Sequence, residues 1–299
     1  MKWTSAFCSI CIFLCVIFSS KGNVYGQEDV FAEGDLLFSR GQYLEAGIAY
    51  ERVYYTAEDS RLRVLANLRK SNALKQQGEF ARVVNDLQRS LPYAPDDSLR
   101  RQLLYEMALC AHLSGGYPQS QSLILQYEAN FPDEAFNSAL GLLKGLNLVK
   151  LKQWDALENY LEEVRLEEQG WEPGDSLQQA LQQLLEEDNR PTMRDPEKAR
   201  LFSTLIPGSG HMYAGEPGAG LLNGFSQLAS LGVTILMGFN QLYVSGFVVG
   251  LGLFQSFYFG GIRMAGELTE ERNTKEMSYY QHKLSALLFE IYQAPPNEP

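Results

Sequence analysis

PGAGLLNGFSQLASLGVTILMGFNQLYVSGFVVGLGLFQSFYFGGI, from Pro217 to Ile262, is the longest stretch of the chain without a charged residue. Its 46 residues include no Asp, Glu, Lys, Arg or His. A membrane-spanning helix needs roughly 20 apolar residues, so the stretch is long enough for two such helices and a tight turn at 239–242. The sequence therefore predicts a transmembrane helical hairpin. The alternative is a pair of core helices in a soluble protein.

Small residues recur inside this stretch at the four-residue spacing that lets membrane helices approach closely. Gly220 and Gly224 form one such pair, and Gly246 and Gly250 form another. Helix contacts in lipid depend on close backbone approach and on weak interhelical hydrogen bonds. The pairs therefore predict close packing, either within the hairpin or between two copies of the chain.

A glycine-rich motif, Pro207-Gly208-x-Gly210-x-x-Tyr213-x-Gly215, comes directly before the hairpin. It does not fit a phosphate-binding loop, because no Lys-Ser or Lys-Thr pair follows and Tyr213 replaces the third glycine of a dinucleotide fingerprint. We expect a short helix at 196–206 that Pro207 stops and that lies at the membrane surface, with Tyr213 at headgroup level. Followed by helices rich in small residues, the motif resembles the small two-transmembrane-helix domains of bacterial envelope proteins.

The N-terminus has the layout of a secretory signal peptide. Lys2 precedes the uncharged apolar run from Ala6 to Phe18, which is too short to span a membrane comfortably. We expect cleavage after Gly26, and an uncleaved signal anchor is the alternative. Of the four cysteines only Cys110 would then remain, so no disulfide can form within the mature chain.

Composition argues against nucleic acid as a partner and against catalysis. The formal net charge is −11, which opposes binding to a polyanion. His112, His211 and His282 lie in unrelated segments without cysteine or carboxylate partners at metal-ligand spacing. We therefore expect no enzyme activity, no metal and no cofactor.

The segment that follows the signal peptide repeats with a period of 37 residues. Four aromatic residues mark this period, namely Tyr43, Phe80, Tyr117 and Trp154. A glycine lies two positions before each of the first three, at Gly41, Gly78 and Gly115, and Lys152 takes that position in the fourth. Apolar residues at three- and four-residue steps follow the aromatics, as in an amphipathic helix. A glycine in a left-handed conformation ends the preceding helix, so each repeat is predicted to be a helical hairpin.

These repeats resemble tetratricopeptide repeats in the segments RGQYLEAGIAYERV, QQGEFARVVNDLQRSL and SGGYPQSQSLILQYEANFP. Gly34, Gly41, Tyr43 and Ala46 match the small, turn and aromatic positions of that family, whereas Lys152 departs from them. The resemblance covers about 27–164. It implies a right-handed superhelix with a concave face that binds a protein or peptide.

The resemblance implies that the concave face is formed mostly by the first helix of each repeat. Five polar residues are candidates for partner binding there: Arg69, Asn72, Gln76, Glu106 and His112. The alternative interpretation is that they are solvated surface positions without a binding role.

The expected fold is all-α, with a solenoid of helical hairpins followed by a two-helix transmembrane hairpin. The predicted parts are a signal peptide at 1–26, repeats with a capping helix at 27–190, a linker and interfacial segment at 191–216, the hairpin at 217–262, and an amphipathic C-terminal helix and tail at 263–299. Within the last part we expect an amphipathic helix at about 274–292.

A signal peptide and a two-span hairpin together put the repeats and the C-terminus on the exported side of the membrane. Arg200 and Arg263 flank the hairpin, and the positive-inside rule would favour them in the cytoplasm, but Glu197 and Glu267 accompany them. The sequence therefore predicts an inner-membrane protein with a periplasmic repeat domain.

The leading functional hypothesis is a membrane-anchored scaffold of a bacterial envelope, which binds a protein or peptide partner through its repeats and membrane lipid through its hairpin. In the alternative hypothesis the hairpin itself assembles into an oligomeric device for transport or membrane-protein insertion, which the repeats regulate. A homo-oligomer formed through the hairpin is compatible with both.

Overall fold

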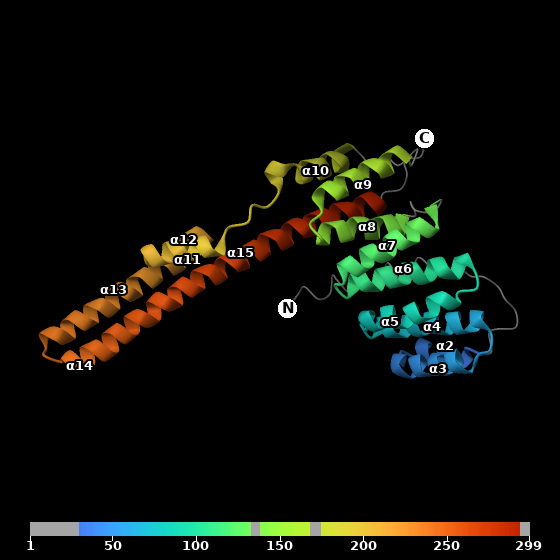
Figure 1. Cartoon of the computed structure of the whole chain (residues 1–299), viewed down its shortest axis with the longest axis horizontal. Helices are drawn as coiled ribbons and strands as arrows, with labels where there is room; N and C mark the ends of the chain where they lie inside the picture. Colours follow the sequence, from blue (N-terminus) through green and yellow to red (C-terminus); the bar gives the residue numbers. More distant parts are fainter. Residues whose placement is uncertain (1–29, 133–137, 168–174, 294–299) are drawn as a thin grey trace. The chain divides into compact units, whose positions relative to one another are not determined.

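The computed structural model describes residues 30–132, 138–167 and 175–293 (Figure 1). Within these ranges the regular secondary structure is helical and no β-strand occurs, which confirms the all-α prediction. The chain divides into two compact units, Met1–Ala135 and Phe136–Pro299. The division falls inside the predicted repeat segment 27–190, so the fourth repeat belongs to the same unit as the hairpin.

The first unit consists of helical hairpins in which each helix packs on the next along the chain (Figure 1). Its helices are α2 (Ala32–Ser39), α3 (Tyr43–Thr56), α4 (Ser60–Gln76), α5 (Phe80–Ser90), α6 (Asp97–Leu113) and α7 (Tyr117–Asn130), with a 3-10 turn η1 (Leu91–Tyr93) after α5. Small residues such as Ala46 of α3 and Ala66 and Ala73 of α4 are fully buried in one cluster. They allow the helices to pack closely.

The 37-residue spacing predicts where the second helix of each hairpin begins. Tyr43, Phe80 and Tyr117 are the first residues of α3, α5 and α7, and Trp154 is the first residue of α9 (Trp154–Glu167). In the first turn the backbone N–H of Gln42 donates to the Leu37 carbonyl over 3.0 Å. The corresponding bond recurs in the other three turns and satisfies a carbonyl at the end of the preceding helix.

The turn residue of each repeat has a left-handed backbone. Its φ angle is 76° at Gly41, 75° at Gly78 and 83° at Gly115. Lys152 takes this position in the fourth repeat with φ 59°. A side chain makes this conformation unfavourable by roughly 1–2 kcal/mol, so the fourth turn is strained where the first three are not.

Each repeat also has a small residue on the first helix of its hairpin. The residue is small because the second helix packs closely against it. A Cβ at Gly34 would overlap the ring of Tyr50. In the third repeat the Ser120 hydroxyl donates to the Ala108 carbonyl over 2.7 Å, which joins α7 to α6. Gly145 takes the same place in the fourth repeat. It was not among the residues that marked the predicted repeat.

The second unit combines the fourth repeat with the predicted hairpin. Its helices are α8 (Ser138–Lys150), α9, α10 (Asp175–Leu185), α11 (Pro196–Leu205), α12 (Ser209–Ala214), α13 (Pro217–Phe239), α14 (Tyr243–Ser245), the π-helical η4 (Gly246–Leu251) and α15 (Gly252–Gln293), with a 3-10 turn η3 (Glu187–Asn189) after α10. α13 runs beside η4 and the start of α15 (Figure 1). A turn at 240–242 joins them, with φ 62° at Gln241, where the sequence predicts it.

The segment that starts at Tyr243 is helical without interruption to Gln293. Residues 274–292 are helical as expected, but the helix does not begin at Thr274, because the second helix of the hairpin continues through 263–273. Ion pairs one turn apart support this part of the helix, namely Arg263 with Glu267, Lys275 with Glu271, and Arg272 with Glu276. The charges after Ile262 therefore mark a change of surroundings and not the end of a helix.

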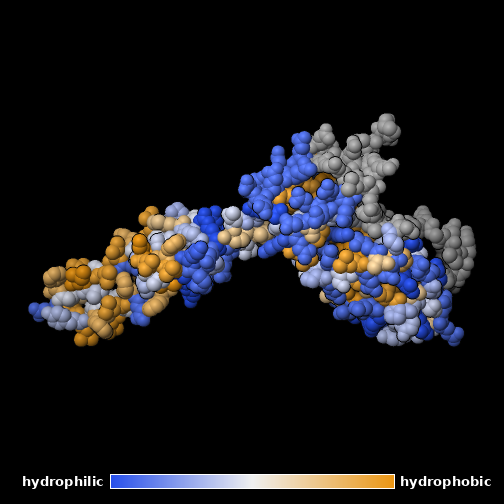
Figure 2. Space-filling model, turned by 45° about the horizontal axis from the view of Figure 1, so that its top comes forward, coloured by the Kyte–Doolittle hydropathy of each residue, from blue (hydrophilic) through white to orange (hydrophobic). Residues whose placement is uncertain are grey.

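Two helices are long and apolar enough to cross a membrane, Pro217–Phe239 and Tyr243–Tyr292. Only 17% of the apolar window of each is buried within the structure, whereas the core helix of a soluble protein is mostly buried. Figure 2 shows hydrophobic side chains gathered over α13, α14 and the adjoining part of α15. An exposed apolar surface of this extent is typical of a membrane or protein contact.

The C-terminal part of α15 belongs to the core of the fourth repeat. Leu284, Leu288 and Ile291 are buried in one cluster with residues of α8, α9 and α10. The Gln281 side-chain amide donates to the Val149 carbonyl at the end of α8 over 3.0 Å. One helix therefore runs from the apolar hairpin into the core of a repeat.

Replacing Lys152 with glycine is expected to stabilise the fourth repeat by about 0.5–1 kcal/mol, because relief of left-handed strain outweighs the added chain entropy of glycine. Gly115→Ala is the matched reverse change. No atom lies within 4 Å of its added Cβ, so its cost of roughly 1–2 kcal/mol comes from φ alone. Hydrogen exchange followed by mass spectrometry should slow in 138–167 for the first variant and accelerate in 97–130 for the second. Unchanged exchange in 138–167 would show that the fourth turn is unstrained.

Candidate functional site

The motif at 207–215 folds into a tight connection between α11 and α13. α11 ends at Leu205, as Pro207 predicts, and Gly208, with a left-handed φ of 86°, turns the chain into α12. Gly215, with φ 94°, ends α12 and leads into α13. The two glycines thus allow three helices to follow one another within a short length of chain.

The glycines also let two backbones touch. A Cβ at Gly208 would overlap the Gly220 carbonyl, and a Cβ at Gly220 would lie 2.5 Å from the Gly208 carbonyl oxygen. A Cβ at Gly224 would lie 3.2 Å from the carbonyl oxygen of Pro207. The first G-x-x-x-G pair therefore packs against the motif and not against the second apolar helix.

His211 lies in the interior of this connection. The residue before it, Gly210, allows α12 to lie directly against α11. A Cβ there would overlap the Ala199 carbonyl and the Ser203 hydroxyl. The His211 side chain is fully buried, and neither ring nitrogen has a hydrogen-bond partner in the described part of the chain. Burial lowers the pKa of His211, because an imidazolium ion loses its hydration there. The neutral ring is therefore the stable form in the fold.

Tyr213 joins the motif to the start of α11. Its hydroxyl accepts a hydrogen bond from the Asp195 backbone N–H over 3.2 Å, and its ring meets the ring of Phe202 edge-on at 5.2 Å between centroids. The Arg194 guanidinium lies 5.6 Å from the Tyr213 ring centroid and donates to the Tyr213 carbonyl. The contacts of Tyr213 within the fold are thus structural, and its place at the lipid headgroups stays a prediction.

A pair of hydrogen bonds ties this connection to α15. The Asn273 side chain accepts from the Arg194 backbone N–H over 2.9 Å and donates to the Arg194 carbonyl over 2.7 Å. Arg200 of α11 pairs with Glu270 of α15 at 3.5 Å. The segment 194–215 therefore packs onto α15 in the region where the apolar hairpin gives way to charged sequence.

The second G-x-x-x-G pair closes the apolar hairpin. Gly246 and Gly250 are buried, and a Cβ at Gly246 would lie 3.0 Å from the Cβ of Met237, while one at Gly250 would overlap Thr234. Asn223 of α13 donates to a carbonyl of α15 over 3.2 Å. Both predicted glycine pairs are therefore used for packing within one chain.

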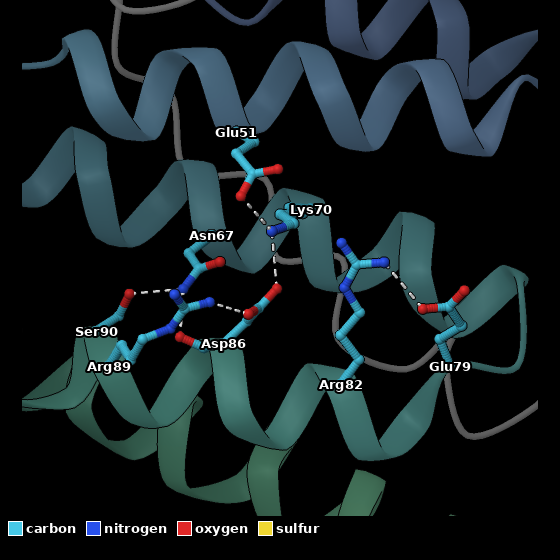
Figure 3. Close-up of polar contacts among 8 residues, drawn as sticks. All are labelled: Glu51, Asn67, Lys70, Glu79, Arg82, Asp86, Arg89 and Ser90. Atoms are coloured by element: carbon cyan, nitrogen blue, oxygen red, sulfur yellow. Dashed lines mark hydrogen bonds and ion pairs between the residues drawn. The ribbon is translucent and has the colours of Figure 1, made fainter.

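In the first unit a buried polar network joins three helices (Figure 3). Lys70 of α4 has a side chain only 5% exposed, and it pairs with Glu51 of α3 at 3.0 Å and with Asp86 of α5 at 2.8 Å. The Asn67 side chain donates to the Asp86 carbonyl over 2.6 Å and to the Ser90 hydroxyl over 2.8 Å. Removing one partner of a buried ion pair typically costs about 3–5 kcal/mol, so the network fixes α3, α4 and α5 against one another.

Three of the predicted partner-binding residues lie on α4, and they differ in their surroundings. Asn72 and Gln76 are exposed. Arg69 pairs with Asp35, and its guanidinium lies 4.3 Å from the ring centroid of Phe31. Arg69 therefore joins α4 to the first hairpin, and the two amides stay available to a partner.

The other two predicted residues lie on α6 and make contacts within the unit. Glu106 pairs with Lys75 at 2.7 Å, and its side chain is 14% exposed. His112 meets the ring of Tyr117 edge-on, with centroids 5.2 Å apart. To bind a partner, Glu106 and His112 would have to contact it while keeping these contacts or after breaking them.

The remaining predictions concern metal ions and the N-terminus. Across 30–132, 138–167 and 175–293, no group of three His, Cys, Asp or Glu side chains is placed to hold a metal ion. The signal peptide predicted at 1–26 lies outside the described residues.

Gly210→Ala is expected to destabilise the second unit by about 1–3 kcal/mol, the usual cost of forcing a methyl group into filled space. Gly218→Ala is the matched control, because no atom lies within 4 Å of its added Cβ. Thermal unfolding of the full-length chain in detergent should show a lower midpoint for the first variant only. Equal midpoints for the two variants would contradict the close approach of α12 to α11.

The stability of the second unit should fall as the pH drops below about 6.5, the usual pKa of histidine in an unfolded chain. Because the pKa of His211 is lowered in the fold, the unfolded state binds the proton more readily, and stability is lost until the lowered pKa is reached. Unfolding midpoints measured across this pH range should lose that dependence in His211→Gln. His282→Gln, at an exposed position of α15, should keep it. Full pH dependence in His211→Gln would assign the effect to another group.

Comparison with known proteins adds no relative from which a site can be transferred. No family model matches the chain, and no curated protein or solved structure matches it either. The resemblance to tetratricopeptide repeats therefore stays a prediction, and only the geometry and composition of this chain support a function.

Proposed function

We propose that this chain is a membrane-anchored scaffold that binds a protein or peptide partner in the bacterial cell envelope. The observation that carries the proposal is the single helix Tyr243–Tyr292, which begins in the apolar hairpin and ends in the core of the fourth repeat. Its 50 residues extend about 75 Å at 1.5 Å per residue. The hydrocarbon core of a bilayer takes up about 30 Å of that length, and the rest carries the repeat.

The surface beside the hairpin suits contact with lipid. α11 exposes Leu201 and Leu205, and Ile206 directly after it is exposed as well. Lys198 is exposed on the same short helix. Apolar side chains beside a lysine are typical of a helix that lies in the headgroup layer. Membrane lipid is therefore the proposed partner of this surface.

The contacts of α15 bear on the topology of the proposed anchor. Its C-terminal part packs on α8, α9 and α10, so these helices lie on one side of any membrane that the hairpin crosses. Two spans return the chain to the side from which it entered. Together with the predicted signal peptide, this supports an inner-membrane protein whose repeats face the periplasm.

The packing of the hairpin favours an anchor over an oligomeric transport or insertion device. Gly220, Gly246 and Gly250 are buried against other parts of the same chain. A transport path would need polar groups that face a cavity, whereas the amide of Gln227 donates to Asn223, which in turn donates to α15. The features that predicted a homo-oligomer thus serve contacts within one chain.

Photo-crosslinking in intact cells tests the scaffold proposal. A photoreactive amino acid replaces either Asn72 or Gln76, the exposed amides of α4, in the full-length chain. Each should give a discrete adduct with a protein partner, while the same group at Glu290, exposed on α15, controls for random encounters. Adducts formed only from Leu236, an exposed residue of α13, would contradict the scaffold proposal and favour the hairpin device.

A further inference from the structure

The first unit contains a pocket that the sequence did not indicate. It has a volume of about 260 Å³ and lies where the end of α3, the start of α4 and the end of α5 with η1 meet. We call it the tyrosine pocket. Its lining residues are Tyr54, Tyr55, Arg63, Val64, Ser90 and Tyr93.

The walls of the tyrosine pocket are held by contacts behind them. Val64 is fully buried, and Ser90 accepts a hydrogen bond from Asn67 in the buried network (Figure 3). The Arg63 Nε donates to the carbonyl at the end of α3, on Ala57, over 2.6 Å. A site whose walls are fixed in advance loses less conformational entropy when it binds.

The rim of the pocket offers aromatic surface to a partner. Tyr55 is 68% exposed and Tyr93 is 57% exposed, and the rings of Tyr54 and Tyr55 meet edge-on at 5.2 Å between centroids. Tyrosine is enriched among the residues that dominate binding energy at protein interfaces. Small-molecule sites usually measure about 300–1,000 Å³, so this pocket fits one large side chain better than a whole cofactor.

The charge of the pocket is positive, although the chain as a whole is acidic. Arg63 is the one charged residue that lines it, and Arg63 forms no ion pair with a carboxylate of the described residues. Arg89 lies close enough to Tyr55 and Tyr54 to interact with them electrostatically, although Asp86 already pairs with it. A carboxylate of a partner would therefore be attracted to Arg63 first.

We propose that the tyrosine pocket binds an acidic peptide segment by taking one aromatic side chain between its tyrosines while Arg63 pairs with a neighbouring carboxylate of the peptide. This inference rests on the proposed scaffold function and names the surface and the partner chemistry. The tyrosine pocket then adds a binding surface at the end of the hairpins, around α3, α4 and η1, to the exposed amides of α4.

Fluorescence anisotropy with labelled peptides tests this chemistry on the full-length chain in detergent. The probe is the acidic peptide Gly-Glu-Asp-Trp-Pro-Glu-Glu-Gly, and two control peptides replace its tryptophan with alanine or its acidic residues with lysine. We expect saturable binding of the probe and at least tenfold weaker binding of each control peptide. Equal binding of the three peptides, or no binding of the probe, would overturn the inference.

Variants of the chain then locate the site. Tyr55→Ala and Arg63→Gln should each weaken binding of the probe at least tenfold, and Arg63→Lys, which keeps the charge, should restore most of it. The matched controls are Tyr279→Ala, at a tyrosine 71% exposed on α15, and Arg82→Gln, at an exposed arginine of α5. Both should bind as the unchanged chain does.

The peptide measurements test the tyrosine pocket, and the crosslinking measurements test the scaffold proposal, so either one can fail without the other. Far-ultraviolet circular dichroism should show that each variant is folded, because Tyr55→Ala removes a side chain that is mostly exposed. Probe binding that is unaffected by both pocket variants would overturn the tyrosine pocket as the site, and adducts from Asn72 or Gln76 would still support a scaffold. If no repeat position forms an adduct, the scaffold proposal fails independently of the peptide result.

Discussion

The second unit is built around one continuous helix, which is uncharged at one end and buried in the core of a repeat at the other. From Tyr243 to Ile262 it carries no charged residue, as a helix in lipid requires. From Tyr280 onward a single apolar face is buried among α8, α9 and α10. Because the two halves share one hydrogen-bonded backbone, the position of the hairpin and that of the fourth repeat are not independent.

Close contacts at glycines and hydrogen bonds together hold α11, α12 and α13 in place beside α15. Glycine removes the side chains that would keep α12 from α11 and the motif from α13, as at Gly208 and Gly210. Such contacts have little directionality, and the orientation comes from polar bonds such as those between Asn273 and Arg194. The buried, neutral His211 beside these glycines is expected to make the same packing sensitive to acid.

Local signals predicted much of the fold, and long-range contacts account for what they missed. The aromatics at a 37-residue spacing predict the first residues of α3, α5, α7 and α9, and Pro207 predicts the end of α11, because these features act within one or two turns of chain. The continuity of α15 was missed because a change from apolar to charged sequence resembles a domain boundary. Spacing alone could not show that Gly220 packs on the motif, that Glu106 pairs with Lys75, or that a tyrosine pocket forms.

Cysteine labelling can show whether a two-span hairpin carries the fourth repeat on one continuous helix. Single cysteines replace Glu58, Asn240 or Lys283, all exposed, in a chain whose own four cysteines are replaced by serine, and a membrane-impermeant maleimide is added to spheroplasts. Labelling at Glu58 and Lys283, with Asn240 reached only after the membrane is permeabilised, is the predicted result. Labelling of Asn240 together with Lys283 from the outside would show that the hairpin does not cross the membrane and that the proposed anchor is wrong.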